Sequence, residues 1–392
     1  MVRVVIIGGG VAGSAAAVAM RRIGADVTVY EAHPDPAGPY GSFVSLAGNG
    51  LRALDALGAL VAVQAAGFPV DRQLMWSGSG RPLGDVPRGR RADDPLRSVT
   101  LTRSDLVAAL RAEATRSGAR IVTGERVSAD DSRCADADLV IAADGIRSSA
   151  RRIVDPNAAE PTFAGLYTVS GVADPIAASP TGSFNMIFGR RGSFIHLTAP
   201  DGVVWWSAQI AADVPPDLAT VTPAGVAACF STEPTAAGIA TATTRIDSAT
   251  INEVLAPVRR QHDDRIVLIG DAAHPVGAGQ GASMALEDAV VLARELAPLG
   301  HEPGGVDIAA ALVSFTALRA DRLGKMARSA SRNRDAKTAG PVAARIRDLV
   351  MPVMFNRMYE RATGWLYDFD PGSLPSPARV VGDRSIAAAE TP

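Results

Sequence analysis

Three glycines near the start of the chain have the spacing of a diphosphate-binding turn. In the segment IIGGGVAG, Gly8, Gly10 and Gly13 follow a β-branched run. In this pattern the first glycine permits a tight turn, the second lets the backbone approach a phosphate, and the third lets a helix pack close to its strand. The helix start at Val11 and Ala12 would present free N–H groups to the anion. We therefore predict that this turn binds the diphosphate of a nucleotide.

Two acidic residues, far apart in the sequence, stand at the ends of predicted strands. Glu31 ends the strand DVTVYE, where it is placed to accept hydrogen bonds from ribose hydroxyls. Asp271 follows the strand IVLI in the segment LIGDAAH, where its carboxylate can accept from a polyol. A simple helix cap is the alternative interpretation of Asp271. A single site that uses both ends of the chain predicts a dinucleotide that spans the fold.

A glycine-rich loop after the second acid opens another predicted helix, over residues 281–296. Gly279, Gly281 and Ala282 lie at the start of this helix. The positive end of the helix dipole would stabilise negative charge on a bound ligand.

A third motif lies between these two. The strand in DLVIAADGIRSSAR ends at Asp144, and Ser148 and Arg151 follow it. A buried aspartate beside arginines can hold a charge network near a phosphate. A strand-to-helix turn with a serine cap is an equally simple interpretation.

Composition limits the classes of function. The 392 residues are 47% hydrophobic and 20% charged, and the formal net charge is −2, which is typical of a globular protein without a nucleic-acid partner. Cys134 and Cys229 have no metal-ligand or disulfide spacing, so we predict no metal site. The chain has no signal-peptide pattern and no apolar run of the ~18 residues that a membrane span needs, which favours a cytoplasmic protein. The two lysines, Lys325 and Lys337, come late, which excludes lysine nucleophiles from most of the chain.

The elements that position these residues predict an α/β protein (α+β overall). A strand, a helix and a strand open the chain, and further strands over 119–123, 139–143 and 266–269 favour a Rossmann-like domain. This nucleotide-binding domain is predicted to be discontinuous, over residues 1–71, 102–158 and 266–330. We also predict one amphipathic helix over 49–60.

The intervening stretches, 72–101 and 159–265, predict a β-rich substrate domain. The segments SFNMIF, SFIHLTA and VVWWSAQI, separated by turn residues, are typical of a meander, and Gly78-Ser79-Gly80 reads as a hairpin turn. Residues 211–250 are weakly patterned. C-terminal helices are expected over 331–370 and a loose tail over 371–392.

The three motifs, in this order, resemble those of the para-hydroxybenzoate hydroxylase family, the class A flavin monooxygenases. The resemblance spans residues 1 to about 296 and includes LTRSDLVAAL, where Arg103 matches a family arginine that contacts FAD. It implies non-covalent FAD, reduction by NADPH or NADH, and hydroxylation of an apolar aromatic or polycyclic small molecule with O₂ through a flavin C4a-hydroperoxide. The implied FAD-binding residues are Gly8, Gly10, Val11, Ala12, Gly13, Glu31, Arg103, Asp144, Asp271, Gly279, Gly281 and Ala282.

The chain departs from the family pattern at three places. The loop after LIGDAAH has only Pro275, where relatives carry a further proline. An arginine that many relatives carry before Gly41 is missing, and Pro39 and Tyr40 stand there. Residues 124–137 are too few for the usual three-stranded crossover.

Candidate substrate residues come from the predicted meander: Asn185, Met186, His196, Trp205, Trp206 and Gln209. His196 could deprotonate a phenol, although a structural role is the simpler interpretation. A halogenase is disfavoured because its Trp-x-Trp-x-Ile-Pro motif and early lysine are missing. A flavin reductase or desaturase of an isoprenoid-like substrate, or a non-catalytic FAD-binding partner, stays open. We expect a monomer or a homodimer.

Overall fold

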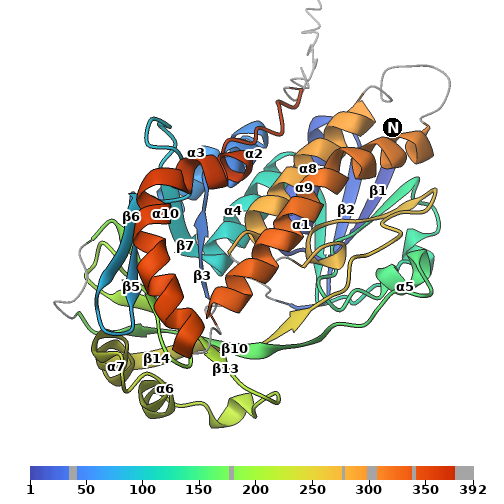
Figure 1. The fold of residues 1–392 in the computed structure, drawn as a ribbon. Coiled ribbons are helices and arrows are strands. Elements are labelled where there is room, and N and C mark those ends of the chain that lie inside the picture. The colour runs from blue at the N-terminus through green and yellow to red at the C-terminus, as the bar shows by residue number, and fades with distance from the viewer. Residues whose placement is uncertain (35–41, 176–180, 276–278, 298–306, 338–340, 376–392) are drawn as a thin grey trace, which may run out of the picture.

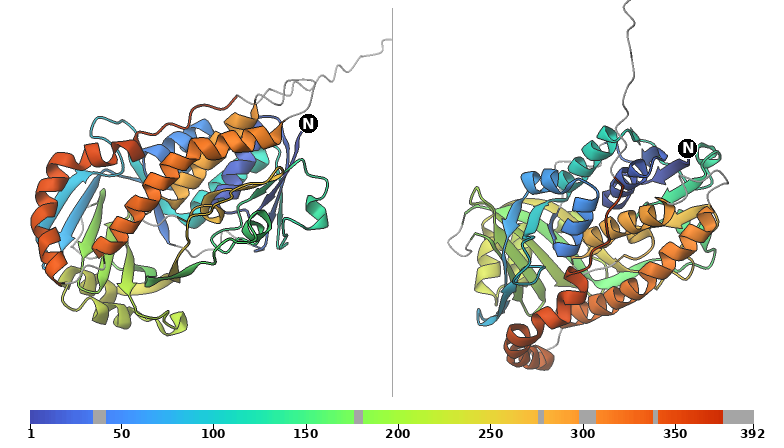
Figure 2. Two further views of the ribbon diagram at one scale, coloured as in Figure 1. Left: turned by 45° about the vertical axis from the view of Figure 1, so that its right-hand side comes forward. Right: turned by 90° about the horizontal axis from the view of Figure 1, so that it is seen from above.

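The fold has a parallel half and an antiparallel half that face each other (Figure 1). The computed structural model describes residues 1–34, 42–175, 181–275, 279–297, 307–337 and 341–375. Figure 2 shows helices over one side of the parallel sheet, with the antiparallel sheet at the other end of the molecule. Short 3-10 turns also occur at Ser132–Cys134 (η1), Leu218–Thr220 (η2) and Gly270–Ala272 (η3).

A five-stranded parallel sheet forms the nucleotide-binding half, in the order β15-β9-β1-β2-β8. Its strands are β1 (Arg3–Ile7), β2 (Asp26–Glu31), β8 (Arg120–Thr123), β9 (Leu139–Ala142) and β15 (Ile266–Leu268). One face packs on α1 (Val11–Arg22), α4 (Arg103–Arg116) and α8 (Gly281–Leu296), and the other on α5 (Ala150–Val154). The predicted Rossmann-like fold is therefore confirmed, and segments 1–31, 139–142 and 266–268 meet in one sheet.

The antiparallel half is a seven-stranded sheet in the order β14-β10-β13-β12-β11-β5-β6. Its strands are β5 (Arg72–Ser77), β6 (Pro82–Pro87), β10 (Thr162–Ala173), β11 (Ser183–Phe188), β12 (Gly192–Thr198), β13 (Val204–Ala211) and β14 (Thr243–Val254). The predicted meander is present as β11–β12–β13, and the predicted hairpin as β5–β6. Helices α6 (Pro223–Cys229) and α7 (Pro234–Thr241) cover one face, which we call the outer face.

A small sheet of β3 (Phe43–Leu46), β7 (Ser98–Thr102) and β4 (Phe68–Val70) lies between the two halves. Side chains of the large sheet pack against β3 and β4, on the side that we call the inner face. Strand β7 carries Val99 and Leu101 into the core that contains α1. The inner face therefore looks toward the nucleotide-binding half.

Two segments differ from the predicted elements. The predicted helix over 49–60 is split into α2 (Gly48–Ala56) and α3 (Leu60–Ala66), because Gly58 adopts a φ of +71° between them. Leu51, Leu54 and Leu57 are nevertheless fully buried, as their spacing predicts. The weakly patterned stretch 211–250 contains α6, α7 and most of β14.

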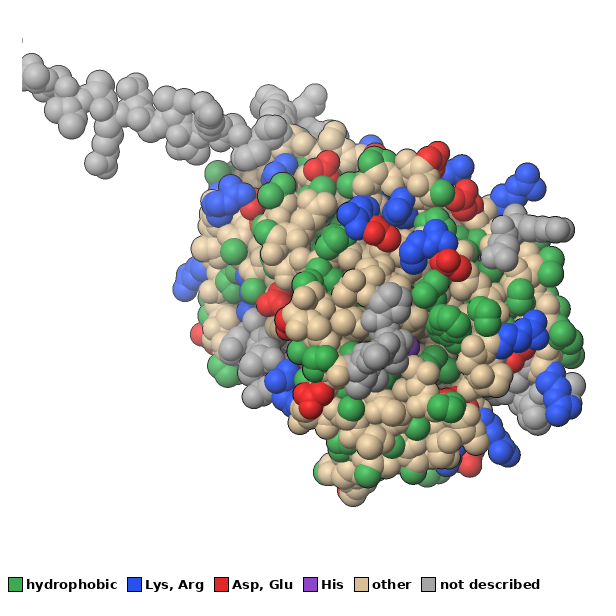
Figure 3. Space-filling model, turned by 90° about the vertical axis from the view of Figure 1, so that its left-hand side faces the viewer, with side chains coloured by type: hydrophobic (Ala, Val, Ile, Leu, Met, Phe, Trp, Pro, Cys, Tyr) green, Lys and Arg blue, Asp and Glu red, His purple; other side chains and the backbone are tan. Residues whose placement is uncertain are grey.

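Two long helices end the described chain, α9 (Ile308–Lys337) and α10 (Pro341–Tyr367). α9 packs along α8, whereas α10 packs mainly along β6, with Pro352 inside it (Figures 1 and 2). Most of the predicted tail lies outside the described residues. Among the described helices, none combines the length and hydropathy needed to cross a membrane. On the α10 side of the surface, basic and acidic side chains are interspersed (Figure 3).

Candidate active site

The glycine turn after β1 is shaped by close contacts on two sides and open space on the third. Gly8 has a φ of +96°, and a Cβ there would lie 2.4 Å from the carbonyl oxygen of Ala143. A Cβ on Gly13 would lie 1.8 Å from the carbonyl oxygen of Gly8. A Cβ on Gly10 would meet nothing within 4 Å. The turn is thus packed against β9 and α1 but open at Gly10, where the pattern places a phosphate.

Glu31 is held rigidly beside this turn. Its carboxylate accepts from the Gly9 N–H at 2.7 Å and from the His33 N–H at 2.9 Å, and the residue is buried. Arg111 of α4 donates to the Gly9 carbonyl at 2.6 Å and lies 3.7 Å from the carboxylate. Each carboxylate oxygen accepts only one of these backbone bonds, so each keeps a lone pair for a ribose hydroxyl.

The second motif meets the first at the ends of β15 and α1. A Cβ on Gly270 would lie 2.8 Å from Cβ of Ala12, so only glycine fits this approach. Asp271 follows in η3 and is solvent-exposed, yet partial burial raises its pKa, while the charges of His274 and Arg103 lower it. The charge of Arg103 therefore acts on the Asp271 carboxyl. Asp271 caps no helix by a hydrogen bond in the described structure.

Arg151 connects the Asp-Gly motif to the turn after β15. The Arg151 guanidinium donates to the carbonyls of Ile146 at 2.7 Å and Ala272 at 2.9 Å. Asp144 caps α5, because Oδ2 accepts from the Ser149 N–H at 2.8 Å, while Oδ1 is buried without a partner in the described structure. Ser148 Oγ also accepts from the Arg151 N–H in the first turn of α5 at 3.0 Å, so the predicted serine cap is present beside the Asp144 Oδ2 contact.

The start of α8 lies beside these groups. Gln280 precedes the helix and provides no side-chain cap, and Gly279 has a φ of +72°. Gly281 and Ala282 are half-buried, so their N–H groups at the positive helix end are reachable by a ligand. The shortened loop at 276–278, and Pro39 and Tyr40, lie outside the described residues.

Comparison with known proteins shows to which family this chain belongs. Residues 1–322 match the family described as FAD binding domain. The chain is 31% identical over 320 residues to 2-heptyl-3-hydroxy-4(1H)-quinolone synthase of Pseudomonas aeruginosa, covering 74% of this chain and 80% of that protein. The chain belongs to the FAD-dependent monooxygenases of the para-hydroxybenzoate hydroxylase type.

Two further similarities extend over most of this monooxygenase. Aurachin C monooxygenase/isomerase of Stigmatella aurantiaca is 29% identical over 343 residues, covering 81% of this chain and 85% of the relative. The crystal structure of Klebsiella pneumoniae HpxO with FAD and uric acid superposes with a TM-score of 0.76 at 23% identity, covering 95% of this chain and 97% of that one. At that identity the superposition supports the fold alone.

The residues of the monooxygenase fit the FAD that its family implies. The open side of Gly10, the hydrogen-bonded carboxylate of Glu31 and the exposed Asp271 lie at the carboxyl ends of β1, β2 and β15. Ligands of open α/β sheets bind at these ends. Sequence reasoning named Arg151 as part of the third motif but missed Arg111, because nothing in the sequence distinguishes Arg111 from the other arginines.

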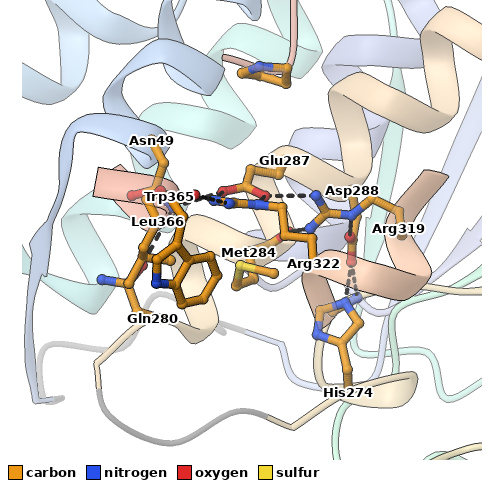
Figure 4. Close-up of polar contacts among 12 residues, drawn as sticks. Asn49, His274, Gln280, Met284, Glu287, Asp288, Arg319, Arg322, Trp365 and Leu366 are labelled. Carbon is orange, nitrogen blue, oxygen red and sulfur yellow. Dashed lines mark hydrogen bonds and ion pairs between the residues drawn. The ribbon is translucent and has the colours of Figure 1, made fainter. Parts of the chain in front are cut away.

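A buried network of charged side chains joins α8 to α9 and to the turn after β15 (Figure 4). Glu287 and Asp288 of α8 face Arg319 of α9, with N–O distances of 2.7 and 2.8 Å. Arg322 of α9 lies 2.6 Å from Glu287. Asp288 also binds the His274 ring at 2.5 Å and accepts from the Gly270 N–H. Burial raises the pKa of Asp288, but the opposing charges of His274 and Arg319 lower it overall. The network thus ties the turn after β15 to both helices.

The predicted substrate residues divide between the two faces of the large sheet. Trp205 lies on the inner face, with its ring 5.3 Å from that of Phe68 and 6.1 Å from that of Phe43. Met186 and Gln209 share this face by register. A pocket opens there, lined by Phe43, Thr102, Ser170, Gly171, Val172, Trp205, Trp206, Arg245 and Asp247.

The structure does not bring the other three residues to that face. Trp206 borders the pocket, but its ring is fully buried on the outer face, where its centroid lies 5.4 Å from that of the stacked Phe194 ring. His196 and Asn185 pair across β12 and β11 on the same side, and Asn185 accepts from Trp76 Nε1 at 3.0 Å. Burial lowers the pKa of His196 to about 4, so its ring is neutral at physiological pH. These side chains pack the sheet beneath α6 and α7.

Proposed function

We propose that this monooxygenase hydroxylates a largely apolar aromatic or fused-ring substrate, held between the flavin and the inner face of the large sheet. The observation that carries this proposal is the inner-face pocket, whose walls include the aromatic rings of Phe43 and Trp205. The quinolone in the name of the Pseudomonas relative and the uric acid bound to HpxO are both fused aromatic rings. A flat, apolar ring is the shape that such aromatic walls accept.

The proposed FAD contacts follow the geometry of the turn. Gly8, Gly10, Val11, Ala12 and Gly13 would hold the diphosphate, and Glu31 the ribose. Arg103, Asp271 and the Oδ1 atom of Asp144 would face the centre of the cofactor, while Gly279, Gly281 and Ala282 would face the flavin ring. When bound and reduced by NADPH or NADH, FAD supplies the activation of O₂.

The protein's own contribution is to orient the substrate and exclude water. Of the candidate substrate residues predicted from the sequence, the three on the inner face are the proposed substrate contacts: Met186, Trp205 and Gln209. His196 is not proposed as a base, because it lies on the outer face and its lowered pKa makes it a weak proton acceptor. Exclusion of water by apolar walls protects reactive states of the bound cofactor.

The test is product mass under ¹⁸O₂ with NADPH or NADH and a panel of phenols, indoles and quinolones. We expect substrate-dependent oxidation of the nicotinamide and one ¹⁸O atom in the product. A reduced or desaturated product without added oxygen would instead favour the reductase. Stoichiometric FAD binding without any substrate-stimulated oxidation would favour a non-catalytic partner.

We also propose a cytoplasmic protein that is a monomer or a homodimer. Both cysteines are free, and Cys134 is buried, which suits a reducing compartment. Light scattering after size exclusion would give the oligomeric state.

A further inference from the structure

One carboxylate of α8 holds both ends of the turn at residues 270–274. Oδ2 of Asp288 accepts from the Gly270 N–H at 2.9 Å, and it binds Nε2 of His274 at 2.5 Å (Figure 4). Arg319 of α9 donates to the other oxygen, Oδ1, at 2.8 Å. Asp288 is only 1% exposed, so water does not compete for these contacts. The carboxylate therefore joins α9 to both ends of the turn.

The same turn is also held by its carbonyl groups and by close packing. Arg151 of α5 donates to the Ala272 carbonyl at 2.9 Å and, with longer geometry, to the Asp271 carbonyl at 3.4 Å. Gly270 lies so close to α1 that a Cβ there would be 2.8 Å from Cβ of Ala12. The backbone of the turn thus has contacts with α1, α5 and α8, which limit its motion.

The carboxylate that this turn carries has no partner of its own. Asp271 is exposed, and its side chain accepts no hydrogen bond from the residues that the structure describes. Since the turn is fixed while this carboxylate is free, the backbone sets the direction in which the carboxylate points. Such an arrangement is typical of a residue that is oriented in advance for a ligand.

We propose that Asp288 is a positioning residue of the cofactor site, which acts through the turn to orient Asp271 toward the polyol hydroxyls of FAD. The inference rests on the proposed FAD contacts, in which Asp271 faces the centre of the cofactor. A hydrogen bond weakens steeply when its distance and angle depart from their preferred values. Release of the turn from Asp288 would therefore cost much of the contact between Asp271 and the cofactor.

Separate titrations of the apoprotein with FAD and with ADP test the proposal, because ADP lacks the polyol chain. Asp288→Asn keeps the shape of the side chain but removes the charge that holds the turn. We expect this variant to bind FAD about 10- to 100-fold more weakly, the effect of one hydrogen bond to a charged group, and to bind ADP within about threefold of wild type. A general loss of stability would instead weaken both ligands alike.

Glu287→Gln is the matched control on the same helix. Glu287 is 0% exposed and belongs to the same buried network. Its carboxylate binds Arg319, Arg322 and the Asn49 amide, and it has no hydrogen bond to the turn in the described structure. The control should lose stability but keep the wild-type ratio of FAD affinity to ADP affinity. The same change of ratio in the control and in Asp288→Asn would overturn the proposal.

A double-mutant cycle shows whether Asp288 acts through Asp271. Asp271→Ala alone should weaken the binding of FAD but not of ADP, and Asp288→Asn added to it should bring no further loss. Additive losses would overturn the positioning role. Unchanged FAD affinity in Asp271→Ala would refute the proposed Asp271 contact and the positioning role with it. These titrations need no substrate, so their outcome is independent of whether the protein hydroxylates an aromatic ring.

His274→Leu decides if Asp288→Asn does not fold, as judged by urea unfolding of the apoprotein. It removes one of the two contacts that Asp288 makes with the turn. We expect FAD binding to weaken by at least about threefold, the effect of one ordinary hydrogen bond, while ADP binding stays unchanged. A wild-type ratio of FAD to ADP affinity in a folded His274→Leu protein would overturn the proposal.

Discussion

The glycines of the first turn are needed for different physical reasons, although the sequence pattern treats them alike. Gly8 and Gly13 leave no room for a side chain, because a Cβ would meet a backbone oxygen at 2.4 or 1.8 Å. Gly10 has an ordinary extended backbone and nothing within 4 Å of a Cβ. The protein fold therefore needs the first two, whereas only a ligand explains the third.

Substitution of these glycines should separate folding from cofactor binding. Gly10→Ala should leave the unfolding free energy of the apoprotein unchanged and weaken FAD binding by at least about tenfold, because the backbone can no longer approach the phosphates. Gly13→Ala should destabilise the apoprotein itself, by roughly 1–3 kcal/mol, through overpacking. Urea unfolding of the apoproteins and fluorescence titration with FAD measure both effects. Normal FAD affinity in a folded Gly10→Ala protein would contradict the proposed site.

The buried ring of His196 should make the stability of the protein, and not its catalysis, depend on pH. Its pKa of about 4 in the folded protein lies below the ordinary value near 6.5, so protonation favours unfolding. The stability that depends on the neutral ring is fully present above about pH 6.5 and is lost as the pH falls toward 4. His196→Leu should remove this loss, which amounts to about 2 kcal/mol by pH 5.

Unfolding midpoints of wild type and His196→Leu between pH 7 and pH 4.5 provide the measurement. The variant should also keep substrate hydroxylation, since His196 lies on the outer face. Loss of hydroxylation in a variant with wild-type stability would restore His196 as a catalytic candidate.

At single residues, the sequence predicts the chemical role of a side chain better than the face of the sheet to which it points. Trp205 and Trp206 are neighbours on one strand, so their side chains point to opposite faces, and only the Trp205 ring packs against Phe43 and Phe68 on the inner face. The alternation of side chains along the strand follows from the sequence, but which face is the inner one depends on how the strands pair.

At the scale of elements, strong local patterns predicted positions well. β2 and α8 have the predicted bounds, because a buried strand ending in an acid and a helix starting after glycines are both locally specified. The prediction of a single helix over 49–60 was wrong in its extent. The spacing of apolar residues continues past Gly58, although the backbone turns there. β14 was missed because it is an edge strand, largely half-buried, whose Thr, Ser and Asp residues do not alternate with apolar ones.

The pairing of α8 with α9, which brings buried side chains of opposite charge together, was not predictable from either helix alone. Arg319 is 1% exposed and neutralises Glu287 and Asp288, which are 0% and 1% exposed. Arg319→Met should destabilise the protein by about 3–5 kcal/mol, because it removes the cation shared by both buried carboxylates and leaves only Arg322 beside Glu287 and His274 beside Asp288. Denaturant unfolding measures this loss.

Arg328→Met on the same helix is the control, since Arg328 is exposed. It should change the unfolding free energy by less than about 0.5 kcal/mol. Equal effects of the two substitutions would mean that the network adds no net stability.

At the scale of the whole molecule, the topology joins segments that the sequence keeps apart. β15 enters the parallel sheet beside β9, although strands β10 to β14 of the antiparallel sheet come between them in the chain, and Gly270 then meets Ala12. The motifs at both ends of the chain predicted this convergence. The division into domains at residues 71, 101, 158 and 265 stays a prediction, although β7 at Ser98–Thr102 pairs outside the large sheet.

A cofactor that spans the fold should protect distant segments at once. We expect FAD to slow amide hydrogen exchange at the start of α1, around Asp271 and at the start of α8, while the outer face around Phe194 and Trp206 stays unchanged. ADP, which carries only the adenosine and diphosphate part, should protect the turn at Gly8–Gly13 and the region of Glu31 but not the start of α8. Exchange measured by mass spectrometry on apoprotein with each ligand makes the comparison. Protection by FAD that matched protection by ADP would place the flavin ring away from α8, and the pocket between the two halves would then lose its assigned role.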